Sequence, residues 1–247
     1  MRVNQLTCGK KNGCEDFSLI KENFRGRKRS IFGLICDGHG GIVAPRMTIN
    51  LLPQCFGLSL DRNQDPIESF NEAFEQTSFE VEGQTSSGAA VLALYINDQD
   101  IYVANAGDCR ALLVRKKDFL QLTNDHVLSN QKERKRIEGY QTKCTQSMIK
   151  VGGQFITMTR SIGDRYFKSF GVIARPEVCH YKIKAGDVAL IAGSDGLFTP
   201  ILNREVANFF RRDNTNFKEK IKELVFSAYA RFGSCSDDIT AMGICFE

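Results

Sequence analysis

The chain has 247 residues, a hydrophobic fraction of 42% and a formal net charge of +4. This composition suits a globular protein with a sizeable core, and the absence of a Pro- or Ser-rich linker predicts a single domain over residues 1–247. The small net charge does not by itself call for nucleic acid or an anionic membrane as a partner, and we expect neither. No apolar run approaches the roughly 18 residues that a membrane span needs.

The nine cysteines are scattered and form no Cys-x-x-Cys pair. Cys36, Cys179 and Cys245 lie inside apolar runs, so we expect free, buried thiols in a reducing compartment and no zinc site. The first eleven residues contain no apolar core of a secretory signal. We therefore expect the protein in the cytosol or the nucleus.

The first informative segment is a predicted hairpin formed by strands at residues 16–21 and 30–36. Its polar, basic connection at residues 25–29 is predicted to be a solvated loop. The hairpin brings Glu15 and Asp16 beside Asp37. Three carboxylates at one end of a sheet repel one another, and a bound cation relieves this repulsion.

The sequence Asp37-Gly38-His39-Gly40-Gly41 directly follows the apolar run 31–35. A carboxylate at a strand end binds a hard metal ion, and a glycine lets its own carbonyl approach the same ion. His39 is then close enough to move a proton. The alternative interpretation is a tight turn with an incidental histidine.

The middle of the chain predicts helices at 42–59 and 66–81 and strands at 89–96, 101–105 and 109–114. Pro66 suits the first turn of its helix, and Ile67, Phe70, Phe74 and Val81 are expected on its buried face. Asp108 lies at the junction between two of the strands. A charged helix at 131–138 is expected to be exposed, and His126 and His180 are expected to be non-catalytic.

The C-terminal part repeats the pattern seen at Asp37. A buried strand at 188–192 ends in Gly193-Ser194-Asp195-Gly196, and Asp237 and Asp238 precede a last strand at 239–246. Helices are predicted at 203–211 and 216–231. Ligands that are all oxygen favour Mg²⁺ or Mn²⁺ over zinc. Two such ions activate a water and clamp a phosphoryl group.

Seven segments, in order along nearly the whole chain, resemble motifs of the metal-dependent serine/threonine phosphatases of the PPM (type 2C) family. They are CED at 14–16, CDGHGG at 36–41, VANAGDCR at 103–110, LTNDH at 122–126, TRSIGD at 159–164, GSDGLF at 193–198 and SDDIT at 236–240. The resemblance implies an α+β fold, a four-layer α-β-β-α sandwich of two stacked antiparallel sheets flanked by helices. It also implies phosphorylated protein substrates and a monomeric enzyme that removes phosphate from serine and threonine in signalling.

The resemblance further implies a centre of two Mn²⁺ or Mg²⁺ ions. Glu15, Asp37 and the Gly38 carbonyl would hold one ion, and Asp37, Asp195 and Asp237 would hold the other. Asp16 would orient the water that attacks phosphorus directly. His39 would act as the general acid that protonates the leaving oxygen.

Three positions depart from the family pattern. Lys11 stands where the family has a phosphate-gripping Arg, so the charge is kept but the bidentate fork is lost. Thr199 replaces an Asp that, in the family, helps to hold a third ion beside the counterparts of Asp108 and Asp195. Asp238 replaces an Asn and adds negative charge beside Asp237.

Two other functions remain open from the sequence. A weakly active or inactive module that uses the phosphatase fold to bind partners is motivated by Lys11 and Thr199. A nucleic-acid binder would use the basic stretches that begin at Arg25 and Lys132, but neither stretch carries a recognition motif.

Overall fold

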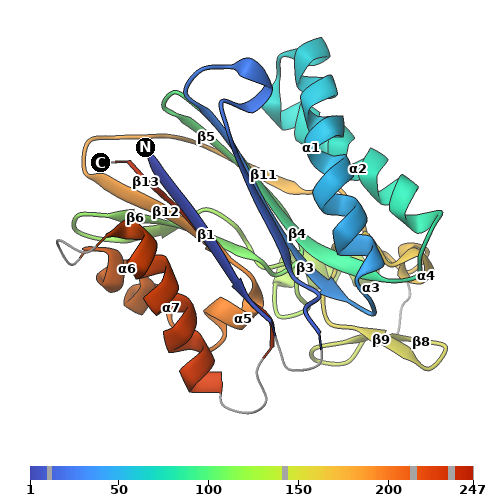
Figure 1. The fold of residues 1–247 in the computed structure, drawn as a ribbon. Coiled ribbons are helices and arrows are strands. Elements are labelled where there is room, and N and C mark those ends of the chain that lie inside the picture. The colour runs from blue at the N-terminus through green and yellow to red at the C-terminus, as the bar shows by residue number, and fades with distance from the viewer. Residues whose placement is uncertain (10–12, 141–143, 212–215, 233–236, 247) are drawn as a thin grey trace.

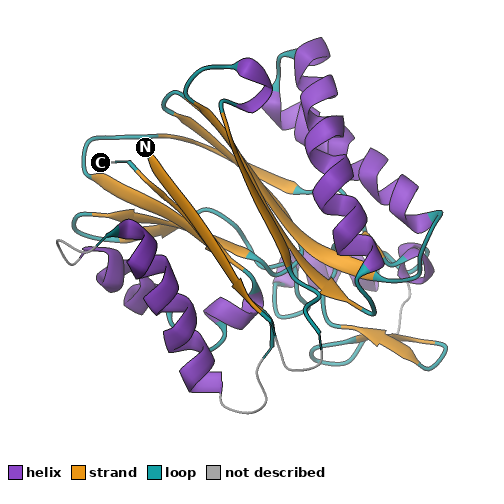
Figure 2. Cartoon of the chain, viewed as in Figure 1, coloured by secondary structure: helices purple, strands orange, loops and turns teal. Residues whose placement is uncertain are grey.

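The computed structural model describes residues 1–9, 13–140, 144–211, 216–232 and 237–246. Two antiparallel sheets are stacked on each other, and helices cover the outer face of each sheet (Figures 1 and 2). The predicted α-β-β-α sandwich is therefore confirmed. Lys11 and Ser236 lie outside the described residues.

The first sheet joins the two ends of the chain. Its strand order is β1 (Arg2–Cys8), β13 (Ile239–Cys245), β12 (Asp187–Gly193), β6 (Arg110–Arg115) and β7 (Phe119–Gln121). Strand β1, which the sequence did not predict, pairs with β13 over its whole length. The helices α5 (Asp195–Phe198), α6 (Asn203–Arg211) and α7 (Phe217–Phe232) pack on the outer face of this sheet.

The second sheet contains the hairpin predicted near the N-terminus. Its strand order is β11 (Glu177–Lys182), β5 (Asp100–Ala106), β4 (Gly88–Asn97), β3 (Ser30–His39) and β2 (Phe17–Glu22), and β10 (Ile162–Gly163) pairs with β4. The short helix η1 (Phe24–Gly26) lies in the β2–β3 connection. Helices α1 (Val43–Asn63) and α2 (Pro66–Glu82) cover the outer face of this sheet.

Two further helices and a small hairpin follow the first sheet's β7 and lie at one end of the sandwich. They are α3 (Gln131–Glu138), α4 (Arg165–Lys168) and the hairpin of β8 (Ile149–Val151) and β9 (Gln154–Ile156). None of the described helices is long and apolar enough to cross a membrane.

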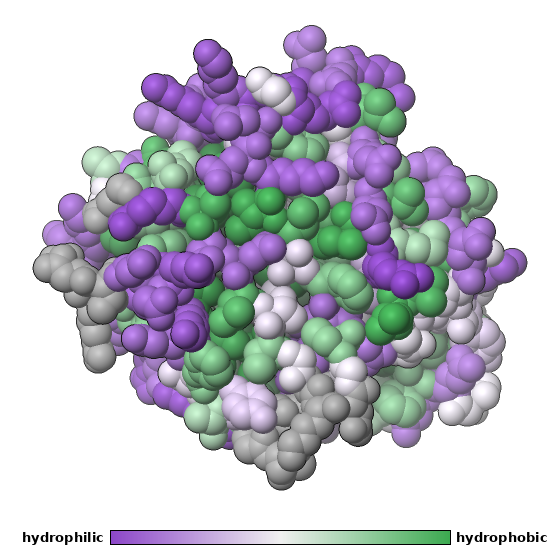
Figure 3. Space-filling model, viewed as in Figure 1, coloured by the Kyte–Doolittle hydropathy of each residue, from purple (hydrophilic) through white to green (hydrophobic). Residues whose placement is uncertain are grey.

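The residues of strand β3 are almost uniformly apolar because both faces of the strand are buried. Phe32 and Leu34 belong to the core under α1 and α2, whereas Ile31 and Ile35 belong to the core between the two sheets. Successive side chains of a strand point to opposite faces, so a strand that is covered on both faces needs a continuous apolar run. On the face shown in Figure 3, hydrophilic residues cover most of the helices, and hydrophobic residues gather mainly between the two helical layers.

The register of the β2–β3 hairpin fixes the start of the candidate site. Phe17 pairs with Cys36, so Asp16 and Glu15 lie directly beside Asp37. This juxtaposition was predicted from the sequence and is confirmed. Of the expected free thiols, Cys36 and Cys245 are buried, but Cys179 is only partly buried because β11 is an edge strand.

Two predictions about helix faces were wrong. Ile67 is 40% exposed, because it lies in the first turn of α2, outside the stripe that packs on the sheet. Helix α3 has the predicted bounds, but it is not fully exposed, since Glu133 and Ile137 are buried. A carboxylate is buried there because two arginines pair with it.

The core under α1 and α2 yields a stability prediction. The ring of Phe56 is fully buried, 4.2 Å from the Phe70 centroid and 5.3 Å from the Phe32 centroid. We expect Phe56→Ala to lower the free energy of unfolding by about 3–5 kcal/mol, because it leaves a cavity in a close-packed core. Phe79→Ala, which truncates a 73% exposed ring of the same layer, should change it by less than about 0.5 kcal/mol. Guanidinium chloride denaturation of both variants measures the difference, and equal losses would contradict this packing.

Candidate active site

The acidic side chains predicted from the sequence meet where strands of both sheets end. Asp37 lies near the end of β3, and Asp195 begins α5 directly after β12. Asp108 follows β5, and Asp237 precedes β13. Because both sheets deliver carboxylates to one end of the sandwich, residues more than 200 positions apart become neighbours.

Asp37 is at the centre of this electrostatic cluster. Burial raises its pKa well above the usual range, and the charges of Asp16, Asp195, Asp108 and Asp237 raise it further. The pKa of Asp195 is also raised, by burial and by the charge of Asp237. The carboxylates therefore lie close enough for their negative charges to disfavour one another's ionised forms.

Asp16 and Asp108 show the same effect. Burial raises the pKa of each to about 7, and the charge of Asp195 contributes at Asp108. Thr240 Oγ1 donates a hydrogen bond of 2.8 Å to Asp16 Oδ2, which favours the ionised form but does not outweigh burial. Asp108 Oδ1 is buried and has no hydrogen-bond partner among the described residues.

Glu15 and Gly38 are held together by the close approach of their backbones. A Cβ atom on Gly38 would lie 2.4 Å from the Glu15 carbonyl oxygen, so no other residue fits there without displacement. The Gly41 amide donates to Glu15 Oε1 at 2.8 Å, and the Glu15 amide donates to Asp238 Oδ2 at 2.7 Å. Asp238 thus adds a negative charge beside Asp237 and also joins the start of β13 to the segment before β2.

His39 is paired with Asp164, a residue that the sequence analysis placed in a motif without assigning it a role. His39 Nε2 lies 2.8 and 2.9 Å from the two carboxylate oxygens. Burial lowers the pKa of His39, but the hydrogen bond and charge of Asp164 outweigh it, so the net pKa is raised. A Cβ atom on Gly88 would lie 2.1 Å from Asp164 Oδ2 and 2.5 Å from His39 Nε2, so a glycine on β4 makes room for the pair.

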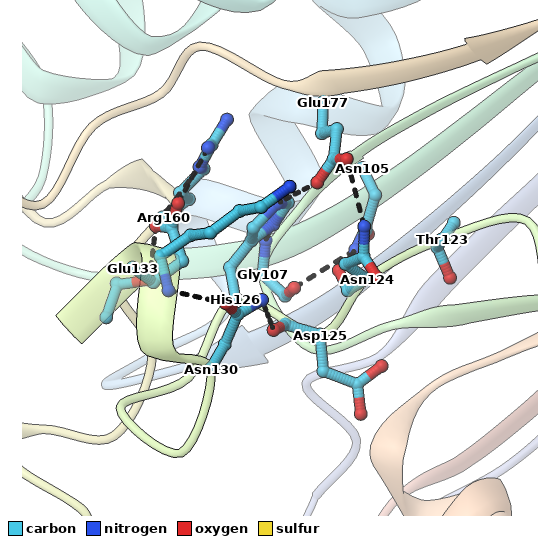
Figure 4. A network of polar contacts seen from close by, with 12 residues as sticks. Asn105, Gly107, Thr123, Asn124, Asp125, His126, Asn130, Glu133, Arg160 and Glu177 are labelled. Carbon is cyan, nitrogen blue, oxygen red and sulfur yellow. Dashed lines mark hydrogen bonds and ion pairs between the residues drawn. The ribbon is translucent and has the colours of Figure 1, made fainter. Parts of the chain in front are cut away.

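The loop that carries Asp108 is held by a network of polar contacts (Figure 4). The Gly107 amide donates to His126 Nδ1 at 3.3 Å, and the His126 amide donates to the Gly107 carbonyl at 2.9 Å. His126 Nε2 lies 3.3 Å from Glu177 Oε2. Burial, with the charge of Arg160, lowers the pKa of His126. His126 therefore supports the loop as a neutral ring.

The same network contains Glu133, a buried carboxylate whose charge is compensated by two arginines. Glu133 accepts hydrogen bonds from Arg160 at 2.7 Å, Arg136 at 2.6 Å and Thr159 at 2.7 Å. Burial alone raises the pKa of Glu133, but these three donors outweigh it and lower the pKa to about 2. Helix α3 is thereby fixed to the segment that leads to Asp164.

The described residues contain no group of three His, Cys, Asp or Glu side chains arranged as a ready-made metal site. The donor set nevertheless fits a divalent cation in its chemistry. It consists of oxygen ligands whose charges repel one another, and it includes the unpartnered Asp108 Oδ1. Thr199 lies at the end of α5 with its side chain exposed, one turn after Asp195.

Comparisons with known proteins agree with this geometry. The family model for Protein phosphatase 2C matches residues 4–234. A "Protein kinase and PP2C-like domain-containing protein" of rice is 32% identical over 96% of the chain, and the Arabidopsis thaliana "Probable protein phosphatase 2C 2" is 34% identical over 95%. The crystal structure of the serine-threonine phosphatase 2C from Toxoplasma gondii superimposes with a TM-score of 0.86 at 17% identity, covering 99% of this chain and 94% of that one.

The mixed fold of two stacked antiparallel sheets flanked by helices is thus the fold of the Toxoplasma gondii structure. The chain belongs to the protein phosphatase 2C family, as its motifs indicated. It spans only 38% of the rice relative and 64% of the Arabidopsis one.

The compensated Glu133 yields a pH prediction. Its pKa is lower in the folded protein than in the unfolded chain, so its contribution to stability is complete above about pH 4.5 and is lost as the pH falls towards 2. Glu133→Gln should abolish this part of the pH dependence, which is on the order of 2–3 kcal/mol. Denaturant unfolding from pH 6 to pH 3 measures it, with Glu138→Gln on the exposed side of α3 as the control. Parallel pH profiles for wild type and Glu133→Gln would contradict the assignment.

Proposed function

We propose that the chain is a Mn²⁺- or Mg²⁺-dependent protein phosphatase that hydrolyses phosphoserine and phosphothreonine. The observation that supports it most strongly is the set of mutually repelling carboxylates around Asp37. Membership of the protein phosphatase 2C family gives the reaction class. Phosphorylated proteins are the proposed substrates.

The metal-holding residues are proposed as follows. Glu15, Asp37 and the Gly38 carbonyl serve one ion, and Asp37, Asp195 and Asp237 serve the other. When bound, two divalent cations lower the pKa of a water molecule and neutralise charge on a transferring phosphoryl group. The charge of Asp195 contributes to the raised pKa of Asp108, so the two carboxylates lie near each other. Asp108 is therefore the candidate ligand for any additional ion.

The chain's own residues supply the remaining functions. His39 is proposed as the general acid, since Asp164 raises its pKa and so favours the protonated ring. Asp164 orients the ring through Nε2. Asp16, whose Oδ2 accepts a hydrogen bond from Thr240, is proposed to orient the attacking water. Lys11, outside the described residues, is the proposed phosphate-binding cation.

The alternative of an inactive binding module is motivated only by Lys11 and Thr199. The retained set of carboxylates, with its repulsion, has no evident use in a module that binds partners but no metal. The phosphatase is therefore the function that the geometry supports best. Nucleic-acid binding is further weakened, because Arg25 and Arg27 both pair with Asp61.

The metal assignment predicts the effect of two substitutions. Asp37→Asn and Asp195→Asn should each reduce hydrolysis of a phosphothreonine peptide by a factor of about 10³ or more, because several kcal/mol of transition-state stabilisation are lost. The metal-free Asp37→Asn protein should be at least as stable as wild type, since Asn removes one of the mutually repelling charges. Calorimetric titration with Mn²⁺ tests binding directly. Asp118→Asn, at a 61% exposed surface carboxylate, is the control, and near-normal turnover in both site variants would refute the assignment.

The assignment of His39 predicts a dependence on the leaving group. His39→Gln should slow hydrolysis of phosphothreonine peptides by about 10²-fold or more, because an alkoxide leaves poorly without a proton. Hydrolysis of an aryl phosphate with a good leaving group should fall far less. Asp164→Asn should act in the same direction with a smaller effect, since it alters the pKa and orientation of the ring. Equal losses on both substrates would show that His39 does not protonate the leaving group.

A further inference from the structure

A pocket of about 670 Å³ opens between the end of α2 and α4 and has no role in the mechanism above. Gly83 and Ser86 line one wall, and Arg165, Tyr166 and Phe170 line the other. The volume lies in the range of pockets that bind small ligands or single side chains.

Both walls of the pocket continue directly into segments that hold the catalytic histidine. Ser86 precedes Ser87, whose carbonyl accepts the Asp164 amide at 3.2 Å and whose Oγ accepts the Ala44 amide at 3.1 Å. Arg165 follows Asp164, the partner of His39. The pocket is therefore joined to the pair of His39 and Asp164 through the chain neighbours Ser87 and Asp164.

The walls are fixed before any ligand arrives. Gly163 pairs with Gly88 of β4, and its amide donates to Ser78 Oγ at 3.2 Å. Lys168 Nζ donates to the Ser161 carbonyl at 2.8 Å and lies 3.8 Å from Glu82 Oε1, so α4 is tied to the end of α2. A preformed pocket binds a side chain without an ordering cost in the protein.

The lining favours an aromatic side chain. The Tyr166 ring is 45% exposed and lies 5.8 Å from the Phe170 ring, which leaves aromatic surface open to a third ring. Arg165 is exposed and has no carboxylate partner among the described residues, so its guanidinium is available to stack on a ring. The hairpin of β8 and β9 supports the outer side of Tyr166, since a Cβ on Gly152 would lie 2.3 Å from Tyr166 Oη.

We propose that this pocket is a specificity subsite that receives an aromatic side chain of the phosphopeptide substrate, near the phosphorylated residue in sequence. The inference rests on the proposed phosphatase function and assigns a sequence preference to it. The pocket acts on peptide binding and does not touch the reacting atoms. An aromatic side chain in a preformed pocket gives a preference on the order of tenfold in kcat/KM.

A series of phosphothreonine peptides tests the preference. Phe, Ala or Glu is placed in turn at each of three positions on either side of the phosphothreonine, and an aryl phosphate without a peptide is measured in parallel. We expect one position at which Phe exceeds Ala about tenfold. A peptide series in which no position distinguishes Phe from Ala, or in which Glu exceeds Phe, would overturn the proposal.

A blocking variant ties the preference to the pocket. Gly83 has an ordinary φ of −71°, and a Cβ atom there meets nothing closer than 3.5 Å. Gly83→Trp is therefore chosen to place an indole ring at the wall of the pocket. It should abolish the Phe preference and leave aryl phosphate hydrolysis unchanged. Gln76→Trp, which adds the same side chain to the outer surface of α2, should leave the preference intact.

A second variant keeps the proposal testable if Gly83→Trp does not fold. Tyr166→Ala should reduce the Phe preference at the same position, whereas Tyr229→Ala, at an exposed ring on α7, should not. Retention of the full preference in Gly83→Trp or Tyr166→Ala would overturn the proposal. Absence of metal-dependent aryl phosphate hydrolysis in wild type would instead refute the proposed function, so the two failures are distinguishable.

Discussion

The repulsion among the carboxylates around Asp37 is the constraint on which the site depends. Burial and four neighbouring aspartates raise the pKa of Asp37, and the two sheets bring these groups together from both ends of the chain. Such a cluster opposes folding unless its charge is neutralised by protons or by a cation. The pairing of β1 with β13 and of β2 with β3 maintains it, because both pairs end beside the acidic residues.

Glu133 shows that the same chain compensates a buried carboxylate where the structure requires it. Two arginines and a threonine lower the pKa of Glu133 to about 2, whereas the pKa of Asp108 is raised to about 7. The difference lies in the partners, since both residues are acidic and both are largely withdrawn from water. At Asp37 and Asp108 most of the neighbouring charges that shift the pKa belong to other aspartates. Such a cluster is suited to a cation supplied from solution.

The sequence predicted much of this architecture because its signals were local. The apolar runs of β3 and β12, each followed by an Asp-Gly pair, identified strand ends that carry Asp37 and Asp195. The role of Asp164 was missed, since its contact with His39 joins residues 125 positions apart and depends on a glycine at position 88. Strand β1 was missed because its alternating polar residues fit an edge strand that only β13 completes. The burial of Glu133 was missed because its partner Arg160 lies on a different segment of the chain.

Metal dependence of turnover tests the central claim most directly. Hydrolysis of a phosphothreonine peptide by the wild-type protein would be followed while Mn²⁺ or Mg²⁺ is titrated, with a chelated sample as the control. The account predicts turnover that appears with the cation, saturates and vanishes with the chelator. Turnover that is unchanged by chelation, or folded protein that stays silent over the whole titration, would contradict the assignment of the Asp37 cluster as a catalytic metal centre.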